Sequence, residues 1–212
     1  MSDNRNDKHQ NVSQVDQGSQ VDLEKRNFLI ATSAVGVLGC AAVAVPFVKS
    51  MTPSERAKAA GAPVEVDVSK IAPGTMMIAE WRGKPVWIIN RTSEMVAELS
   101  KHDDLLSDPN SDVVSQQPEY CKNADRSIKP NLAVIVGICT HLGCSPSPKL
   151  QAHGDMGEGW PGGFFCPCHG SKFDLAGRVL KGSPAPINLV VPPYKYLTDN
   201  TLLIGVDTEG KA

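Results

Sequence analysis

Two short motifs constrain this chain more than any other feature. The first box is Cys139-Thr140-His141-Leu142-Gly143-Cys144, and the second box is Cys166-Pro167-Cys168-His169-Gly170-Ser171. Each box places a cysteine and a histidine where a tight loop can present both to a metal. We expect the glycine in each box to let the backbone approach closely without a side-chain clash. The boxes therefore predict two loops that converge on one metal site.

Residue types alone allow more than one metal at such a site. A Cys2His2 zinc site needs only one cysteine and one histidine from each box. That assignment leaves Cys144 and Cys168 unexplained, although four of the six cysteines fall in the boxes. A zinc-stabilised binding module without a redox role is therefore one alternative.

The N-terminal part predicts a membrane anchor. No charged residue occurs from Phe28 to Val48, and about 21 residues at roughly 1.5 Å rise span about 31 Å, close to the hydrocarbon thickness of a bilayer. A buried soluble helix is the alternative. Lys25 and Arg26 precede the span and Lys49 follows it, which favours a cytoplasmic N-terminus by the positive-inside rule.

The chain therefore divides into four predicted parts. Residues 1–24 form a polar, disordered cytoplasmic tail, residues 25–48 an export signal and transmembrane anchor, and residues 49–63 a linker of undecided stiffness. Residues 64–212 form a periplasmic head, with a metal-binding subdomain at about 137–187. An uncleaved anchor is favoured over cleavage after Ala42-Val43-Ala44, because a long polar tail before the apolar run is atypical of a cleaved signal peptide.

Short β-like runs punctuated by Gly and Pro predict a mainly β head. The expected strands are Val64–Val68, Met76–Trp81, Pro85–Asn90, Ala133–Ile138, Leu189–Val191 and Thr201–Ile204. Thr92 or Ser93 is expected to cap a short helix from Glu94 to Ser100. Residues 101–130 are polar, lack obvious strands and are expected to wrap the surface. Cys40 is expected to be a thiol packed within the span. Cys121 is expected to be an unpaired thiol.

Net charge excludes one class of partner. The formal charge of -2 supplies no broad basic surface for phosphate neutralisation, so nucleic acid is not expected to bind.

The segment Lys25-Arg26-Asn27-Phe28-Leu29 is similar to a twin-arginine export signal with Lys in place of the first Arg. Together with this segment, the boxes and the anchor resemble those of the Rieske iron-sulfur subunits of cytochrome bc1 complexes. That resemblance implies an antiparallel β-sandwich head with an inserted cluster-binding subdomain, and one [2Fe-2S] cluster. Two histidines replace two cysteines on one iron of a Rieske centre. By position, Cys139 and Cys166 would bind the inner iron, and His141 and His169 the outer one.

The resemblance also implies roles around the cluster. Cys144 and Cys168 would form a disulfide, which persists in the periplasm. Ser171 would donate its hydroxyl to a bridging sulfide, and Leu142 would be an apolar docking residue. The segment from Gly182 to Pro186, with Pro184 and Pro186, would cover the cluster. Many members carry a tyrosine where this chain has Phe173, so one tuning hydrogen bond is expected to be missing. A plain turn is the alternative for the proline segment, and a passive spacer is the alternative for the linker.

The implied function is electron transfer in a respiratory or photosynthetic chain. His169 and His141 would take an electron, coupled to a proton, from quinol at the cytochrome b subunit, and the head would pass the electron to cytochrome c1. The subunit would be single-pass in a bacterial inner membrane, as part of a dimeric quinol-cytochrome c reductase. The alternative is the Rieske small subunit of another periplasmic oxidoreductase, such as an arsenite oxidase.

Overall fold

The computed structural model describes residues 22–55, 57 and 61–207. The chain separates into two compact units, Met1–Ser54 and Glu55–Ala212, which we treat one at a time. All but the last three residues of the predicted tail, 1–24, lie outside the described residues, as do positions 56 and 58–60 of the predicted linker.

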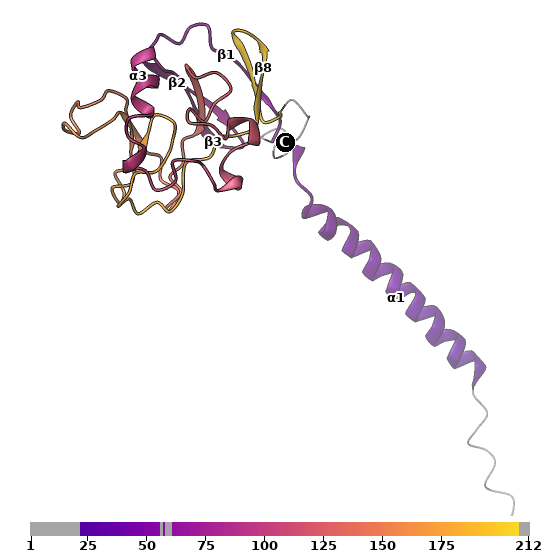
Figure 1. Ribbon diagram of the computed structural model, residues 1–212. Helices are drawn as coiled ribbons and strands as arrows, with labels where there is room; N and C mark the ends of the chain where they lie inside the picture. Colours follow the sequence, from indigo (N-terminus) through magenta and orange to yellow (C-terminus); the bar gives the residue numbers. More distant parts are fainter. Residues whose placement is uncertain (1–21, 56, 58–60, 208–212) are drawn as a thin grey trace, which may run out of the picture. The chain divides into compact units, whose positions relative to one another are not determined.

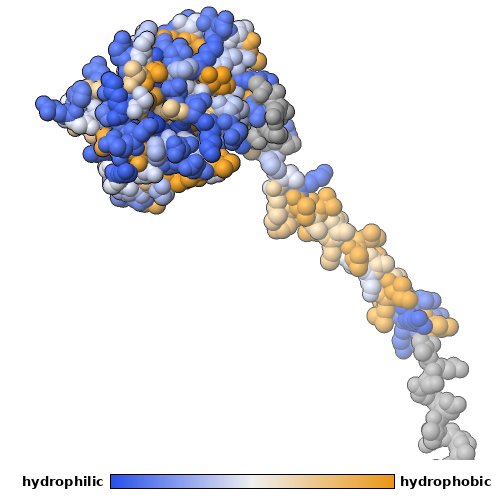
Figure 2. Space-filling view, in the orientation of Figure 1, coloured by the Kyte–Doolittle hydropathy of each residue, from blue (hydrophilic) through white to orange (hydrophobic). Residues whose placement is uncertain are grey.

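The first unit contains one long helix, α1 (Leu23–Ser50), of 28 residues. Asp22 is its N-cap, and the Asp22 side chain accepts a hydrogen bond from the backbone N–H of Lys25, which satisfies one of the free amides at a helix start. The helix buries none of its residues within the chain, and Figure 2 shows hydrophobic side chains along most of its length with hydrophilic ones near both ends. Among the described residues it is the one helix long and apolar enough to cross a membrane.

The second unit is built from short antiparallel strands joined by long loops (Figure 1). Its described residues form three three-stranded sheets, in the orders β1-β9-β8, β2-β3-β4 and β5-β6-β7. The strands are β1 (Val64–Asp67), β2 (Thr75–Trp81), β3 (Lys84–Asn90), β4 (Leu132–Val136), β5 (Ser147–Lys149), β6 (Gly163–Phe165), β7 (Lys172–Asp174), β8 (Tyr194–Thr198) and β9 (Thr201–Ile204).

The sheet β2-β3-β4 is central because both of its faces are covered. Alternate residues of a strand point to opposite faces, and in β3 Val86 and Ile88 join one core cluster while Trp87 and Ile89 join another. The first cluster includes residues of β1, β8 and β9 and forms the sandwich of the head. The second cluster packs the central sheet against the region that carries both boxes. The central sheet therefore supports both boxes from below through the second cluster.

Five of the six expected strands are present, within two residues of their expected ends, and Leu189–Val191 is wrong. That run has no strand assignment, although Val190 accepts from the amide of Val136 and Val191 donates to the carbonyl of Gln116. Its apolar side chains face two different partners in an irregular segment, which short-range periodicity cannot distinguish from a strand. Strands β5 to β8 were not expected. Three of them have only three residues each, too few to show an alternation.

The helix α3 (Ser93–Leu99) begins one residue earlier than expected, with Thr92 as its N-cap. The following segment, 101–130, contains no strand among its residues, as expected, but three 3-10 turns: η1 (Asp103–Leu105), η2 (Val114–Gln116) and η3 (Glu119–Cys121). The expectation that it only wraps the surface is wrong. Cys121 and Arg126 are fully buried within it, because its polar groups find partners inside the head. Cys121 is not in a disulfide, as expected.

Candidate metal centre

The first box forms a tight loop separated by two residues from β4, an edge strand of the central sheet. The backbone N–H of Cys139 donates to the carbonyl of Cys144 at 2.7 Å, and the N–H of Gly143 donates back to the carbonyl of Cys139 at 3.0 Å. These two bonds close the loop on itself and hold the side chain of Cys139 inward, where it is 3% exposed.

The second box repeats this geometry after β6. The N–H of Cys166 donates to the carbonyl of Ser171 at 2.8 Å, and the N–H of Gly170 donates to the carbonyl of Cys166 at 2.9 Å. The two boxes, far apart in sequence, therefore form loops with the same hydrogen-bond pattern. Each presents its first cysteine to the interior and its histidine nearer the surface.

Each loop needs its glycine for its backbone conformation. Gly143 and Gly170 have φ values of 84° and 80°, in the left-handed region that only glycine adopts without strain. No atom of the described chain lies within 4 Å of a Cβ built at either position. Backbone conformation, not close approach of other protein atoms, requires glycine here.

The inward cysteines of the two loops meet. Cys139 and Cys166 belong to the same core cluster above the central sheet, and the thiol of Cys139 is near enough to affect the pKa of Cys166. Burial raises the pKa of the Cys166 thiol, and contact with Cys139 raises it further, whereas backbone N–H groups of Cys168 and His169 lower it. Those amides point at the sulfur as donors to a thiolate would.

The histidines of the two loops also meet. The ring centroids of His141 and His169 are 4.8 Å apart, with the ring planes at 87°. His141 is half-buried and His169 is exposed. Leu142, beside them, is 71% exposed. Two sulfurs inside and two imidazoles outside make a donor set that fits a [2Fe-2S] cluster of the His2Cys2 type.

A disulfide between Cys144 and Cys168 ties the two loops together. The sulfur atoms of Cys144, Cys166 and Cys168 lie within 4.8 Å of one another. Because two of these sulfurs are bonded to each other, only Cys166 can offer a thiolate. The bridge explains the two cysteines that a zinc site would leave without a role.

The proline segment, together with Ile187 directly after it, contacts both boxes. The backbone N–H of Ala185 donates to Oγ of the fully buried Ser171 at 3.1 Å, and Thr140 Oγ1 donates to the carbonyl of Ile187 at 2.6 Å. The backbone N–H of Lys172 donates to Ser183 Oγ at 3.0 Å. This segment is therefore a third loop of the site.

Thr140, Ser183 and Ala185 have roles that the sequence did not suggest. Each makes a hydrogen bond that joins the proline segment to a box or to the residue after it. The available signal was the hydroxyl of Thr140 inside the first box.

Phe173 lies in β7, two residues after Ser171, and is fully buried. It pairs with Phe164 of β6 and belongs to the same core cluster as Cys139 and Cys166. Phe164 in turn stacks on Trp87 of the central sheet with ring centroids 4.4 Å apart. Phe173 is thus part of the apolar support beneath the two sulfurs.

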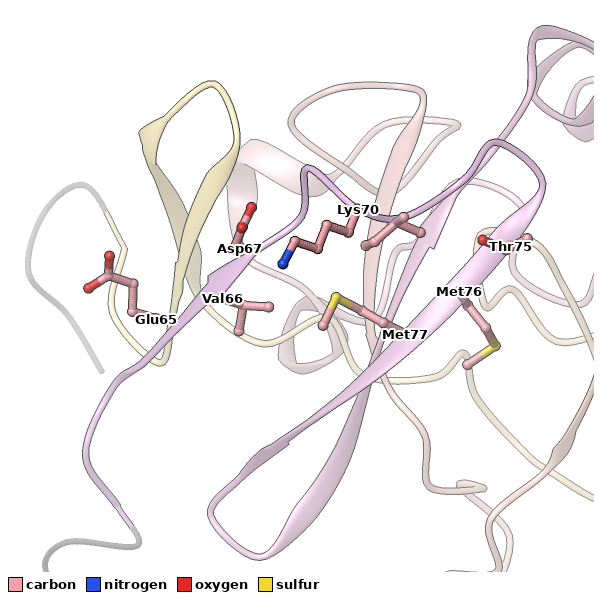
Figure 3. A pocket seen from close by; sticks show the side chains of 8 residues that line it. Glu65, Val66, Asp67, Lys70, Thr75, Met76 and Met77 are labelled. Atoms are coloured by element: carbon pink, nitrogen blue, oxygen red, sulfur yellow. The ribbon is translucent and has the colours of Figure 1, made fainter.

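One pocket lies away from both boxes. It has a volume of about 480 Å³ and is lined by residues of β1 and β2 with Lys70 and Ile71 between them. Figure 3 shows the side chain of Lys70 extending into the space between Asp67 and Met77. The pocket lacks any residue of the boxes or the proline segment, so we assign it no part in the metal site.

Two family models match the chain. Residues 16–54 match the model described as "Ubiquitinol-cytochrome C reductase Fe-S subunit TAT signal". Residues 63–195 match the model of the Rieske [2Fe-2S] domain, which covers both boxes and the proline segment.

Two similar bacterial proteins match most of this chain and most of their own length. The ubiquinol-cytochrome c reductase iron-sulfur subunit of Allochromatium vinosum is 56% identical over 186 residues, covering 87% of this chain and 89% of the relative. The subunit of the same name from Blastochloris viridis is 43% identical, covering 85% and 92%. Among solved structures, a chain of a hyperthermophilic respiratory Complex III is 29% identical, covers 82% of this chain and 97% of its own, and has a TM-score of 0.45.

Proposed function

Because this chain belongs to the Rieske [2Fe-2S] family, as one of the iron-sulfur subunits of ubiquinol-cytochrome c reductase, we propose that Cys139, His141, Cys166 and His169 hold its single cluster. The observation that carries this assignment is the matched pair of loops, which brings two buried sulfurs together beneath two imidazoles. When bound, the cluster supplies one-electron chemistry to the oxidoreductase complex of which the chain is a subunit.

The site residues divide the work by their depth. Cys139 and Cys166 are buried against the central sheet, so the surrounding core keeps water away from their sulfurs. His141 and His169 lie nearer the surface, where a substrate can reach them. His169, the more exposed of the two, accepts a hydrogen bond from the hydroxyl of a quinol and takes its proton. The electron enters at the same place, so one electron and one proton leave the quinol together.

Ser171 stabilises the reduced state. Its Oγ accepts from the amide of Ala185, so its own O–H is left to donate toward a sulfide of the cluster. A donor to the site favours the form with the greater negative charge. The disulfide between Cys144 and Cys168 and the hydrogen bond from Thr140 to Ile187 hold the three loops together.

The exposed end of the loops is the docking surface. Leu142 is exposed, and Pro184 and Pro186 are also exposed on either side of the buried Ala185. We assign these exposed apolar residues to contacts with the cytochrome b subunit during quinol oxidation and with cytochrome c1 afterwards. Residues 49–63 then serve as the linker that lets the head, residues 64–212, reach both partners.

The helix α1 anchors the subunit in the bacterial inner membrane, with the head in the periplasm. Its apolar length and the match of residues 16–54 to an export-signal model support this placement. N-terminal sequencing of the mature membrane protein should find Phe28–Val48 retained. A mature chain that begins near Val45 would show a cleaved signal instead.

The ligand assignment is tested by electron paramagnetic resonance of the reduced, membrane-bound protein. Cys139→Ser and His169→Ala should each abolish the Rieske signal. Cys121→Ala is a matched control, because Cys121 is equally buried but belongs to the core on the other face of the central sheet, and its signal should persist. A Rieske signal that survives in Cys139→Ser or His169→Ala would refute the assignment.

The partners are tested by purification from detergent extracts. We expect the chain to co-purify with cytochrome b and cytochrome c1 in a dimeric complex. Recovery with another periplasmic oxidoreductase and without these two cytochromes would contradict the proposed partners.

A further inference from the structure

Two buried arginines donate hydrogen bonds to the turn that follows the second box. The turn runs from Asp174 at the end of β7 to Arg178. Its carbonyl at Leu175 accepts from Nη1 of Arg91 at 3.3 Å, and its next carbonyl, at Ala176, accepts from Nη1 of Arg126 at 3.0 Å. Two guanidinium groups from distant parts of the chain therefore converge on consecutive residues just after the metal loop.

Arg126 carries a charge that no carboxylate contacts directly. It is fully buried, and its other acceptors are the carbonyls of Gln116 and Leu189 and Oε1 of Gln117, at 3.2, 2.8 and 3.0 Å. All are neutral groups. Among the described residues, Nε of Arg126 has no hydrogen-bond partner. Burial lowers the pKa of Arg126 to about 10, which still leaves it protonated at neutral pH.

Arg91 is likewise a buried arginine that donates to neutral groups. It is 2% exposed and donates to the carbonyls of Pro130 and Asp125 and to Oγ of Ser127, in addition to Leu175. Within the described part of the chain, it too has no ion-pair partner. Arg178 at the end of the turn differs, because it is paired with Asp174 at 2.7 Å and Asp103 at 2.8 Å.

Arg126 is hydrogen-bonded to the core cluster that contains the sulfurs of the proposed site. Leu189, whose carbonyl accepts from Arg126, is fully buried in the core cluster that contains Cys139 and Cys166. Apolar side chains fill that cluster, so water cannot screen the space between the guanidinium and the sulfurs. Charges interact more strongly through such a medium than across a solvated surface.

We propose that the buried positive charge of Arg126, together with that of Arg91, raises the reduction potential of the site. The inference rests on the proposed cluster ligands. With two ferric ions, two sulfides, two thiolates and neutral histidines the oxidised site would sum to zero charge, and an electron added without a proton would give it one negative charge. A fixed cation in the low-dielectric interior stabilises that added charge, and net local charge is one of the properties that sets the potential of an iron-sulfur site.

The test is a redox titration of the Rieske resonance signal in the full-length chain within its membranes. Arg126→Gln removes the charge and should lower the equilibrium constant for reduction about tenfold, which is about 59 mV for one electron. Arg126→Lys keeps the charge but not the planar fork, and its potential should stay near that of the parent. Arg82→Gln is the control, because Arg82 is exposed at the hairpin between β2 and β3, and it should leave the potential unchanged.

Each result decides the inference. An unchanged potential in Arg126→Gln would overturn it, and equal falls in Arg126→Gln and Arg126→Lys would show that the contacts, not the charge, matter. If Arg126→Gln does not accumulate, Gln117→Glu replaces it, since this exchange of similar size places a carboxylate at Nη2 of Arg126. It should lower the potential, and no fall would equally overturn the inference. A parent chain without the Rieske signal would refute the proposed ligands instead.

Discussion

Oγ of Ser171 accepts a hydrogen bond from the backbone N–H of Ala185 at 3.1 Å. A hydroxyl oxygen that accepts in this way still has one proton to donate. Because Ser171 is fully buried, that proton cannot go to bulk water. The contact therefore orients the hydroxyl and links the proline segment to the second box.

Ser171→Ala should lower the reduction potential, because it removes a donor that stabilises the more negative reduced form. If the bond is worth about 1 kcal/mol more in the reduced state, the fall is about 40 mV at 59 mV per tenfold. Redox titration of the resonance signal measures it. Ser183→Ala is the matched control, since Ser183 Oγ accepts from the amide of Lys172 and should not affect the potential. An equal fall in both variants would point to loop disorder.

Phe173→Tyr should raise the potential. Phe173 is fully buried in the cluster that contains Cys139 and Cys166, so a hydroxyl added there has a ligand sulfur within its environment. A new bond worth about 1 kcal/mol more in the reduced state gives an upward shift of roughly 40 mV. Voltammetry of the detergent-solubilised chain measures it. A fall, or no shift, would mean that Phe173 does not occupy the tuning position.

The control for this substitution is Phe164→Tyr. Phe164 pairs with Phe173 between β6 and β7 but stacks on Trp87, so its new hydroxyl is not expected to reach a ligand sulfur. Its potential should remain that of the parent.

Cys144→Ser should loosen the two loops by removing the bridge to Cys168. The bridge closes a segment with a sequence separation of 24, for which the chain-entropy estimate is about 3 kcal/mol. We expect the Rieske signal to disappear at a lower temperature than in the parent. Cys121→Ser, which removes a thiol that is not in a disulfide, should cost less. Equal thermal losses in the two variants would contradict a stabilising role for the bridge.

Stability of the head should fall at alkaline pH. Burial raises the pKa of Cys121 from 9.0 to about 11, and burial raises the pKa of Tyr120 and of Tyr196 from 10.0 to about 12. The folded state thus holds these protons more tightly than the unfolded chain. The resulting stability is fully present below pH 9 and is lost as the pH rises through 11 and 12.

The measurement is the midpoint temperature of the near-ultraviolet circular dichroism signal between pH 8 and 12. Cys121→Ala should lose less stability than the parent between pH 9 and 11, by on the order of 2 kcal/mol. Parallel curves for the two proteins over that interval would show that the thiol does not contribute.

Local sequence determined the anchor, the central strands and the chemistry of the boxes. An uncharged run from Phe28 to Val48 can satisfy its backbone in a membrane only as a helix, and β3 shows the alternation of a two-faced strand. The boxes are equally local, because a cysteine and a histidine on one tight loop are set by a few consecutive residues. The residue types of the proposed site therefore follow from residues read in order, whereas the expected cluster follows from the resemblance to the Rieske subunits.

Only the tertiary structure decided how the two boxes meet and what surrounds them. The contact of Cys139 with Cys166 depends on packing both loops on the central sheet, and strands of three residues such as β6 form because that packing holds them. The partners of Arg126 lie up to 63 residues away in sequence. A buried charge is recognisable only once its surroundings are known, since Arg126 and the exposed Arg82 are the same residue type in the sequence and differ only in the solvent that folding removes from one of them.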